Sequence, residues 1–348
     1  MTTVVSNSLY PVQGVEHRFY HGNRYHCVSA KVTLQWDDEG RLHSVAKQPD
    51  WVRNDLWRAR ENRSGLLVAS ELIPFKPTTD VLVVGSVRPP DGRPARSWAG
   101  ALIVGTREKR LRFHGPRRWR HGLMSGWTLS EPEPCEQVSL SYENAYGGVV
   151  EDKEEYADGE FHPANPLGCG YVGRHRPDTS RTYRAPQIEA WDSPVVAFGR
   201  DAAVGGLGPL PGFFPERLKY AGTYDSAWEA DVKPDIPLDM DMRYWQTAPE
   251  DQRSDDYLRA GDTISLVGLR PGNPLTLELP PFDPALVCDI AGRPRESRRM
   301  NLDTVSVDLD RRHLVLRYHR IVAFDAALES IRVHCAPYKP LSGEVRHG

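Results

Sequence analysis

Residues 304–324, TVSVDLDRRHLVLRYHRIVAF, carry the clearest β-hairpin pattern in the chain. Apolar and polar side chains alternate from Val305 to Leu309, which is typical of a strand with one buried face. The polar run at 310–312 suits a tight turn, and the apolar-rich residues 313–324 follow it as a return strand. The segment therefore predicts two antiparallel strands and favours a mainly β protein.

The N-terminal part contains a second alternating stretch, residues 25–36, YHCVSAKVTLQW. One of its faces is apolar throughout, so we expect a half-buried strand, a turn at 37–40 and a return strand at 41–45. The apolar face consists of Val28, Ala30, Val32, Leu34 and Trp36. Further strands are predicted at 81–87, 98–104, 109–114, 262–269 and 275–279.

Residues 151–260 have a different character, because proline, glycine and aromatic residues interrupt every long apolar pattern. Disordered segments are poor in aromatic residues, so we expect ordered loops with short helices near 215–231 and 249–259. The sequence thus predicts one compound β-rich domain over 1–348. In it, sandwich-like sheets from the strand-rich parts 1–150 and 261–336 surround the loop-rich middle 151–260, and residues 337–348 form a tail.

Composition narrows the class of protein. The 348 residues include 44 Lys and Arg against 47 Asp and Glu, and the net charge of −3 argues against a surface that binds polyanions everywhere. There is no apolar run near the ~20 residues of a membrane span and no leader pattern at the start, so we expect a cytoplasmic protein without a membrane partner.

Motifs for cofactors and metals are missing from the sequence. It contains neither a phosphate-binding loop nor a dinucleotide-binding glycine pattern. Its five cysteines lie far apart, and His17, His21 and His26 stand near a turn signal without a neighbouring cysteine. We therefore expect no metal and no cofactor.

Two features leave alternative functions open. Glu143 and Asp225 stand beside aromatic residues, as the acids of sugar-cleaving enzymes often do, so a hydrolase acting on a glycan or lipid is one alternative. The stretch from Arg107 to Arg120 is rich in arginine with Phe113 and Trp119 interleaved, which suits a module that binds nucleic acid. Because the chain is acidic overall, an acidic protein surface is the favoured partner of this stretch.

Several short motifs, taken in order, are similar to those of a bacterial family. They read PFKPTTDV at 74–81, YENAYGG at 142–148, NPLGCG at 165–170, AGTYDSAW at 221–228, APEDQ at 248–252 and LDTV at 302–305. The family that they resemble is known only as a domain of unknown function, and it is found beside type VI secretion effectors, especially those with PAAR-like tip domains. The resemblance covers about residues 64–325.

The resemblance implies a cytoplasmic adaptor or chaperone without a catalytic centre. Such a protein binds a cognate toxic effector before export and helps to mount it on the valine-glycine-repeat spike. The motif residues that the resemblance marks as structural are Phe75, Lys76, Pro77, Asp80, Tyr142, Glu143, Gly147, Gly148, Asn165, Gly168, Gly170, Gly222, Tyr224, Asp225, Trp228, Asp251 and Gln252.

These motifs can be interpreted physically. Their glycines permit positive φ or close backbone approach, and their aspartates can cap turns and helix starts, so they are typical of a rigidly held irregular surface. Protein interfaces draw most of their binding energy from a few buried aromatic and arginine anchors. The candidate partner-binding anchors are Arg117, Trp119, Trp127, Phe213, Phe214, Tyr244 and Trp245.

Overall fold

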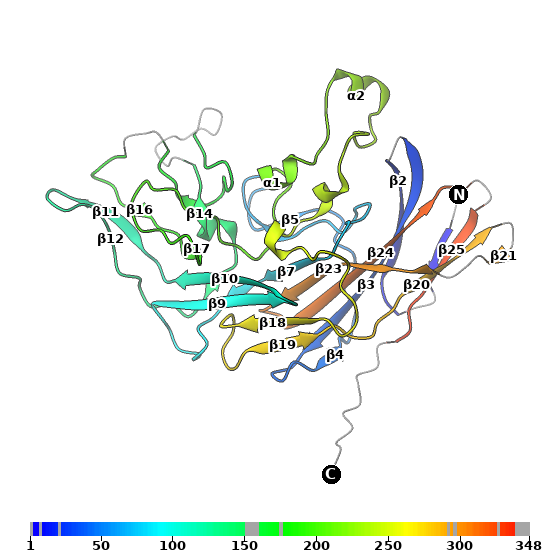
Figure 1. Ribbon diagram of the computed structural model, residues 1–348, viewed down its shortest axis with the longest axis horizontal. Coiled ribbons are helices and arrows are strands. Elements are labelled where there is room, and N and C mark those ends of the chain that lie inside the picture. Colours follow the sequence, from blue (N-terminus) through cyan, green and yellow to red (C-terminus); the bar gives the residue numbers. More distant parts are fainter. Residues whose placement is uncertain are drawn as a thin grey trace, which may run out of the picture.

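The computed structural model describes residues 3–6, 9–19, 22–149, 160–173, 177–290, 293–294, 298–325 and 328–337. Strands predominate over these residues and the helices are short, so the predicted mainly β class is confirmed (Figure 1). The hairpin expected at 304–324 is present as β23 (Asn301–Asp308) and β24 (His313–Ala323). It lies at the centre of the largest sheet.

This largest sheet joins the two ends of the chain. Its strand order is β2 (Val12–Phe19), β3 (Asn23–Trp36), β24, β23 and β7 (Asp80–Val84), with β4 (Leu42–Ser44) paired to β3. β7 and β23 run parallel, with Val81 beside Val305, while the pairs β2–β3, β3–β24 and β24–β23 are antiparallel. The two C-terminal strands β24 and β23 therefore lie between N-terminal strands in one sheet.

Two further sheets pack with the largest one. One has the order β17 (Ile188–Ala190), β10 (Arg107–His114), β9 (Ser97–Val104), β18 (Thr263–Val267) and β19 (Leu275–Glu278). The other has the order β1 (Thr3–Ser6), β25 (Leu328–His334), β20 (Ala285–Ile290) and β21 (Arg293–Pro294), with β22 (Arg298–Arg299) on β20. Val305, Leu266 and Ile331, one from each sheet, belong to the same buried apolar cluster. The sheets thus share a core in the expected sandwich-like way.

Smaller elements organise the middle of the chain. The short ladders are β12 (Gly126–Leu129) with β11 (Arg118–Gly122) and β16 (Tyr183–Arg184), β13 (Val138–Ser139) with β8 (Ser86–Val87), β14 (Tyr146–Gly147) with β15 (Cys169–Gly170), and β5 (Leu56–Trp57) with β6 (Leu66–Val68). The helical turns are η1 (Tyr142–Asn144), α1 (Pro215–Leu218), α2 (Ser226–Asp231), η2 (Met242–Trp245) and η3 (Glu250–Gln252). In Figure 1 the β11–β12 hairpin and the segment with α2 project from the body.

The expectation that β3 is half-buried is wrong. Its apolar face lies in the core, but Lys31 and Thr33 on the opposite face are buried as well. Loops from the following 40 residues cover that face: Lys31 Nζ lies 2.6 Å from Glu71 Oε2, and Thr33 N donates to Gln48 Oε1 at 2.8 Å. The Lys31 ammonium can occupy this second interior because it has an acidic partner there.

The helix expected within 249–259 is limited to the single turn η3. After it, backbone bridges join Arg253 to Asp80 and Leu258 to Leu302. The backbone groups of this segment are therefore satisfied by β7 and β23 instead of by helical hydrogen bonds. The helices expected near 215–231 are present as α1 and α2. Of the predicted tail, residues 338–348 lie outside the described part of the chain.

Candidate functional site

A buried ion pair within the motif at 74–81 meets the start of the motif at 248–252. Lys76 Nζ donates to Asp80 Oδ2 at 2.7 Å, and both side chains are almost completely buried. The same oxygen accepts the backbone N–H groups of Thr247 at 2.6 Å and Ala248 at 3.2 Å. Burial lowers the pKa of the Lys76 ammonium, and the carboxylate of Asp80 opposes that shift. The pair therefore fixes the loop before η3 to the start of β7.

Gln252 of η3 links the same region to the neighbouring sheet. Its Nε2 donates to the carbonyl oxygens of Val81 and Leu207, at 2.8 and 2.9 Å, and its Oε1 accepts Lys109 Nζ at 2.9 Å. Lys109 also donates to Asp251 Oδ1 at 2.7 Å. Burial lowers the pKa of Lys109, and the Asp251 carboxylate opposes this shift. The APEDQ motif thus serves as a bridge between sheets.

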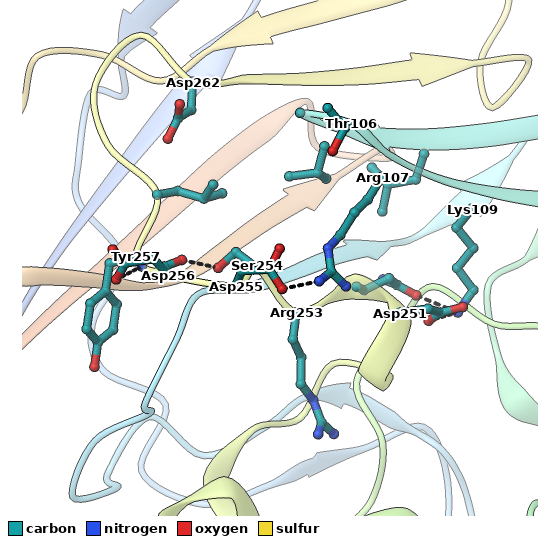
Figure 2. A pocket seen from close by; sticks show the side chains of 15 residues that line it. Thr106, Arg107, Lys109, Asp251, Arg253, Ser254, Asp255, Asp256, Tyr257 and Asp262 are labelled. Atoms are coloured by element: carbon teal, nitrogen blue, oxygen red, sulfur yellow. Dashed lines mark hydrogen bonds and ion pairs between the residues drawn. The ribbon is translucent and has the colours of Figure 1, made fainter.

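A pocket of about 280 Å³ lies beside this bridge, between β9–β10 and residues 251–262. Figure 2 shows Arg107 directed to Asp255 and Lys109 directed to Asp251, and both contacts are ion pairs. Arg253 is directed away from them, and its Nη2 lies 3.1 Å from Glu216 Oε1. Both cations of β10 that line this pocket therefore already have an acidic partner in its lining.

The LDTV motif supplies the next buried carboxylate. Asp303 faces Arg317 on β24, with 2.5 Å between Asp303 Oδ2 and Arg317 Nη2, and His319 Nδ1 lies 3.0 Å from the same oxygen. Burial alone would raise the pKa of Asp303, but Arg317 and His319 more than offset it, and the pKa lies well below the usual range. We call Lys76, Asp80, Gln252, Asp303 and Arg317 the buried motif network.

A larger cavity of about 410 Å³ lies between the covered face of the largest sheet and the loops over it. Lys31, Lys76 and Arg317 reach its floor. Each of these cations has an acidic partner: Lys31 pairs with Glu71, Lys76 with Asp80 and Arg317 with Asp303. The walls carry apolar side chains of residues 67–69 and of β7. The floor is thus charge-compensated, and its polar groups hold the loops on the sheet.

The motifs at 142–148 and 165–170 bind each other. Asn165 Nδ2 donates to the carbonyl oxygens of Tyr142 at 2.9 Å and of Tyr146 at 3.0 Å. Gly148 has a φ of 101°, and a Cβ atom there would lie 2.2 Å from the carbonyl oxygen of Gly168. Both the positive φ and the close backbone approach therefore require glycine at this position.

Arg117, a candidate anchor, lies inside the molecule. Its Nη2 lies 2.5 Å from Glu189 Oε1 and donates to the carbonyl oxygen of Pro186 at 2.6 Å. Burial would raise the pKa of Glu189, but hydrogen bonds from His114 and Arg117 hold it below its usual range. This arginine is buried, and its guanidinium is occupied by a structural ion pair with Glu189.

The aromatic candidates divide into two groups. Trp119 and Phe214 are buried in separate apolar clusters, so they are core residues. Trp127, Phe213, Tyr244 and Trp245 are only partly buried and pack against these clusters or against the one around Phe19 and Phe75. Large aromatic rings bury a large apolar area, and this explains why Trp119 and Phe214 lie in the core.

The motif at 221–228 is the one that faces solvent. It lies in residues 219–241, between α1 and η2, which we call the α2 arm (Figure 1). Helix α2 has no buried residue, and 55% of the Tyr224 surface is exposed. The Tyr224 ring lies edge-on to Trp228, with 4.7 Å between the ring centroids. An aromatic pair is thus presented at the surface of a projecting segment.

Local hydrogen bonds hold the α2 arm in shape. Asp225 caps α2 by accepting Trp228 N at 2.8 Å, as an N-cap aspartate does. Trp228 Nε1 donates to the carbonyl oxygen of Asp235 at 2.9 Å, and Thr223 binds Asp239 through both its N–H and its hydroxyl group. These bonds join the two sides of the arm, and Met240 near its end belongs to the buried cluster around Phe19 and Phe75.

Glu143 and Asp225, the acids proposed for a hydrolase, lie in separate turns. Glu143 of η1 accepts Gly65 N at 2.6 Å and a hydrogen bond from Ser141 Oγ. Asp225 caps α2. The structure does not bring the two carboxylates together, and each has a local structural partner.

The basic stretch Arg107–Arg120 also divides. Its first part is paired: Arg107 with Asp255, Lys109 with Asp251 and Arg110 with Glu108. In its last part, Arg118 and Arg120 are exposed on β11. The stretch therefore does not form one continuous basic surface.

Sequence reasoning missed several residues that the structure makes prominent. Arg217 is buried in α1 and donates to the carbonyl oxygens of Leu210 and Tyr244. Nothing in its neighbourhood in the sequence distinguishes it from a surface arginine. Leu123 and Met124 are fully exposed between β11 and β12. The flanking glycines of GLMSG at 122–126 were the available signal for a hairpin tip.

Comparisons with known proteins place the chain in a family. Among the described residues, no helix has both the length and the apolar character needed to cross a membrane. No curated protein and no solved structure matches the chain. The model of one family, described as "Uncharacterized protein conserved in bacteria (DUF2169)", matches residues 21–319. Because this match spans most of the sequence, the chain belongs to that bacterial family of unknown function.

Proposed function

We propose that this chain is an adaptor that binds a PAAR-like effector of a type VI secretion system in the cytoplasm and helps to load it on the valine-glycine-repeat spike. The observation that carries the proposal is the exposure of the α2 arm. It presents Tyr224 to solvent, while Asp225 and Trp228 hold its backbone through internal hydrogen bonds. Recognition in proteins is commonly built on such projecting loops over a rigid scaffold.

The kind of partner rests on the resemblance of the motifs between residues 74 and 305. The geometry supports binding over turnover, because Glu143 and Asp225 each satisfy a backbone N–H group in a different turn. A hydrolase of the kind considered needs two carboxylates across one substrate. The geometry also disfavours a nucleic-acid surface along β10, because Arg107, Lys109 and Arg110 already face carboxylates.

Co-expression with the PAAR-like effector encoded beside the gene tests the proposal. We expect the full chain and the effector to elute as one complex in size-exclusion chromatography at concentrations of about 1 μM, the range of specific protein complexes. Two separate peaks at that concentration would contradict the adaptor function.

A substitution in the α2 arm locates the contact. We expect Tyr224→Ala to weaken the complex about 30-fold, because truncating an aromatic hot spot costs ~2 kcal/mol of binding free energy. Its circular dichroism and melting temperature should match the wild type, because the ring is exposed. Leu9→Ala is the control, since 84% of Leu9 is exposed outside the arm. Equal affinities of Tyr224→Ala and the wild type would exclude the arm as the contact.

A further inference from the structure

The β11–β12 hairpin carries an apolar tip that the fold does not use. Leu123 and Met124 are fully exposed. Gly122 pairs with Gly126 across the base of the turn, and Gly126 has a φ of 63°. A three-residue loop closed by a glycine in the left-handed region is a defined hairpin connection. The turn lies at the end of a projecting ribbon (Figure 1), and its two apolar side chains are exposed to solvent.

The outer face of the same ribbon carries three arginines. Arg118 on β11 lies directly opposite Arg184 on β16, and Arg120 follows on the same face, two residues along β11. All three are exposed. Like charges directly opposite each other destabilise a strand pair. Among the described residues these arginines have no carboxylate partner, and Arg184 has one long hydrogen bond, 3.4 Å, to the amide oxygen of Asn144.

The aromatic residues of the ribbon lie on its other face. Trp119 is buried, and Trp127 stacks on Phe198 with 4.0 Å between the ring centroids. Proteins that bind single-stranded nucleic acid use exposed rings as stacking platforms. The ribbon offers no such platform on its arginine face, since its rings pack inward. An anionic lipid surface is also disfavoured, because the chain as a whole has a net charge of −3.

Arginine is the residue suited to carboxylates, because its planar guanidinium can donate two parallel hydrogen bonds to one carboxylate. Leucine and methionine at a fixed tip suit an apolar pocket, and methionine adapts to its shape. We propose that this hairpin is a docking element for an acidic protein surface. Leu123 and Met124 enter an apolar pocket of the partner, and Arg118, Arg120 and Arg184 bind the carboxylates around it.

The proposal rests on the proposed function, since the partner to be tested is the same effector. The hairpin would be a second contact with the effector, and it is basic whereas the α2 arm is acidic. The arm carries six Asp and Glu residues against two Lys. Several of these acids already bind Thr223, Lys233, Arg243 or the start of α2. A second copy of this chain therefore offers few free carboxylates on its arm to the arginines.

Affinities of the purified full chain for the effector test the hairpin. We expect Leu123→Ser with Met124→Ser to weaken binding at least about 10-fold, because two buried apolar contacts are lost. Arg118→Glu with Arg120→Glu should weaken it by a similar factor and reduce its dependence on salt. The control Lys47→Glu with Arg53→Glu makes the same charge change at exposed positions and should bind like the wild type.

Each contrary result has a distinct meaning. If both hairpin variants bind like the wild type while Tyr224→Ala binds weakly, the hairpin proposal is wrong and the adaptor function stands. If the wild type forms no complex, both are wrong. The wild type could also co-sediment with vesicles of about 30% phosphatidylserine in phosphatidylcholine. If the Leu123→Ser/Met124→Ser variant lost this binding, the hairpin would bind a membrane and the protein-docking proposal would be wrong. If the wild type self-associated and the same variant did not, the partner of the hairpin would be a second copy of this chain and the effector proposal would be wrong.

Discussion

The buried motif network and the α2 arm place the same residue type in opposite environments. Asp80 accepts hydrogen bonds from Lys76 and from the backbone of Thr247 in the interior. Asp225 accepts one from the backbone of Trp228 at the surface. Loss of a partner leaves a charge without water in the first case, whereas water replaces the partner in the second. Motifs of one family can therefore lie in the interior or face solvent, and substitutions can distinguish the two.

The largest effect is expected at Asp303. Asp303→Asn leaves the buried guanidinium of Arg317 without its charge partner, and breaking a buried pair costs about 3–5 kcal/mol. We expect the free energy of unfolding, measured in urea, to fall by that amount. Glu229→Gln on the α2 arm removes an exposed partner of Lys233 and should leave it nearly unchanged.

A double variant tests the same ion pair even if the single variant fails to fold. Asp303→Asn combined with Arg317→Met removes both charges, and it should recover much of the stability lost in the single variant. A single variant as stable as Glu229→Gln would show that the network does not differ from the arm.

The backbone contact at Gly148 gives the next effect. Gly148→Ala places a Cβ atom against the carbonyl oxygen of Gly168 at a positive φ, so we expect a loss of about 2–3 kcal/mol in urea unfolding. Gly105→Ala is the matched control, because φ there is 58° and nothing lies within 4 Å of the added atom. It should cost only the ~1–2 kcal/mol of a left-handed alanine. Equal losses in the two variants would mean that the loop at 165–170 shifts to make room for the added Cβ atom.

Acid should weaken the network through Asp303. Burial opposes ionisation, but Arg317 and His319 hold the pKa of Asp303 below that of the unfolded chain. The ionised carboxylate therefore stabilises the fold above about pH 4, and its contribution is lost as the pH falls below that value. We expect the stability of the wild type to fall about 1.4 kcal/mol per pH unit more steeply than that of Asp303→Asn. Parallel pH profiles in urea unfolding would contradict this.

The sequence predicted the strands better than the site. The hairpin at 304–324 was predictable because alternation reports directly which face is buried. The second buried face of β3 was not, because the loops that cover Lys31 have no periodic pattern. Asp225 was predictable as a helix cap from its place before α2. The role of Asp80 depends on a partner 167 residues away, Thr247, which no local pattern reveals.

The smallest effect on stability, and the most local, is expected at the cap of α2. This helix has six residues and buries none of them, so it depends on its local hydrogen bonds. Asp225→Ala removes the acceptor for Trp228 N and should cost about 1 kcal/mol within the arm.

Hydrogen exchange should detect this change where the melting temperature does not, because the α2 arm adds little to the shared core. Exchange at the amides of residues 228–231 should accelerate about 5-fold, which corresponds to ~1 kcal/mol of local opening. Asp225→Asn is the control, because asparagine caps helices as well as aspartate does. Slow exchange in Asp225→Ala would mean that the core, and not the cap, holds the arm, and the contrast between arm and network would fail at this point.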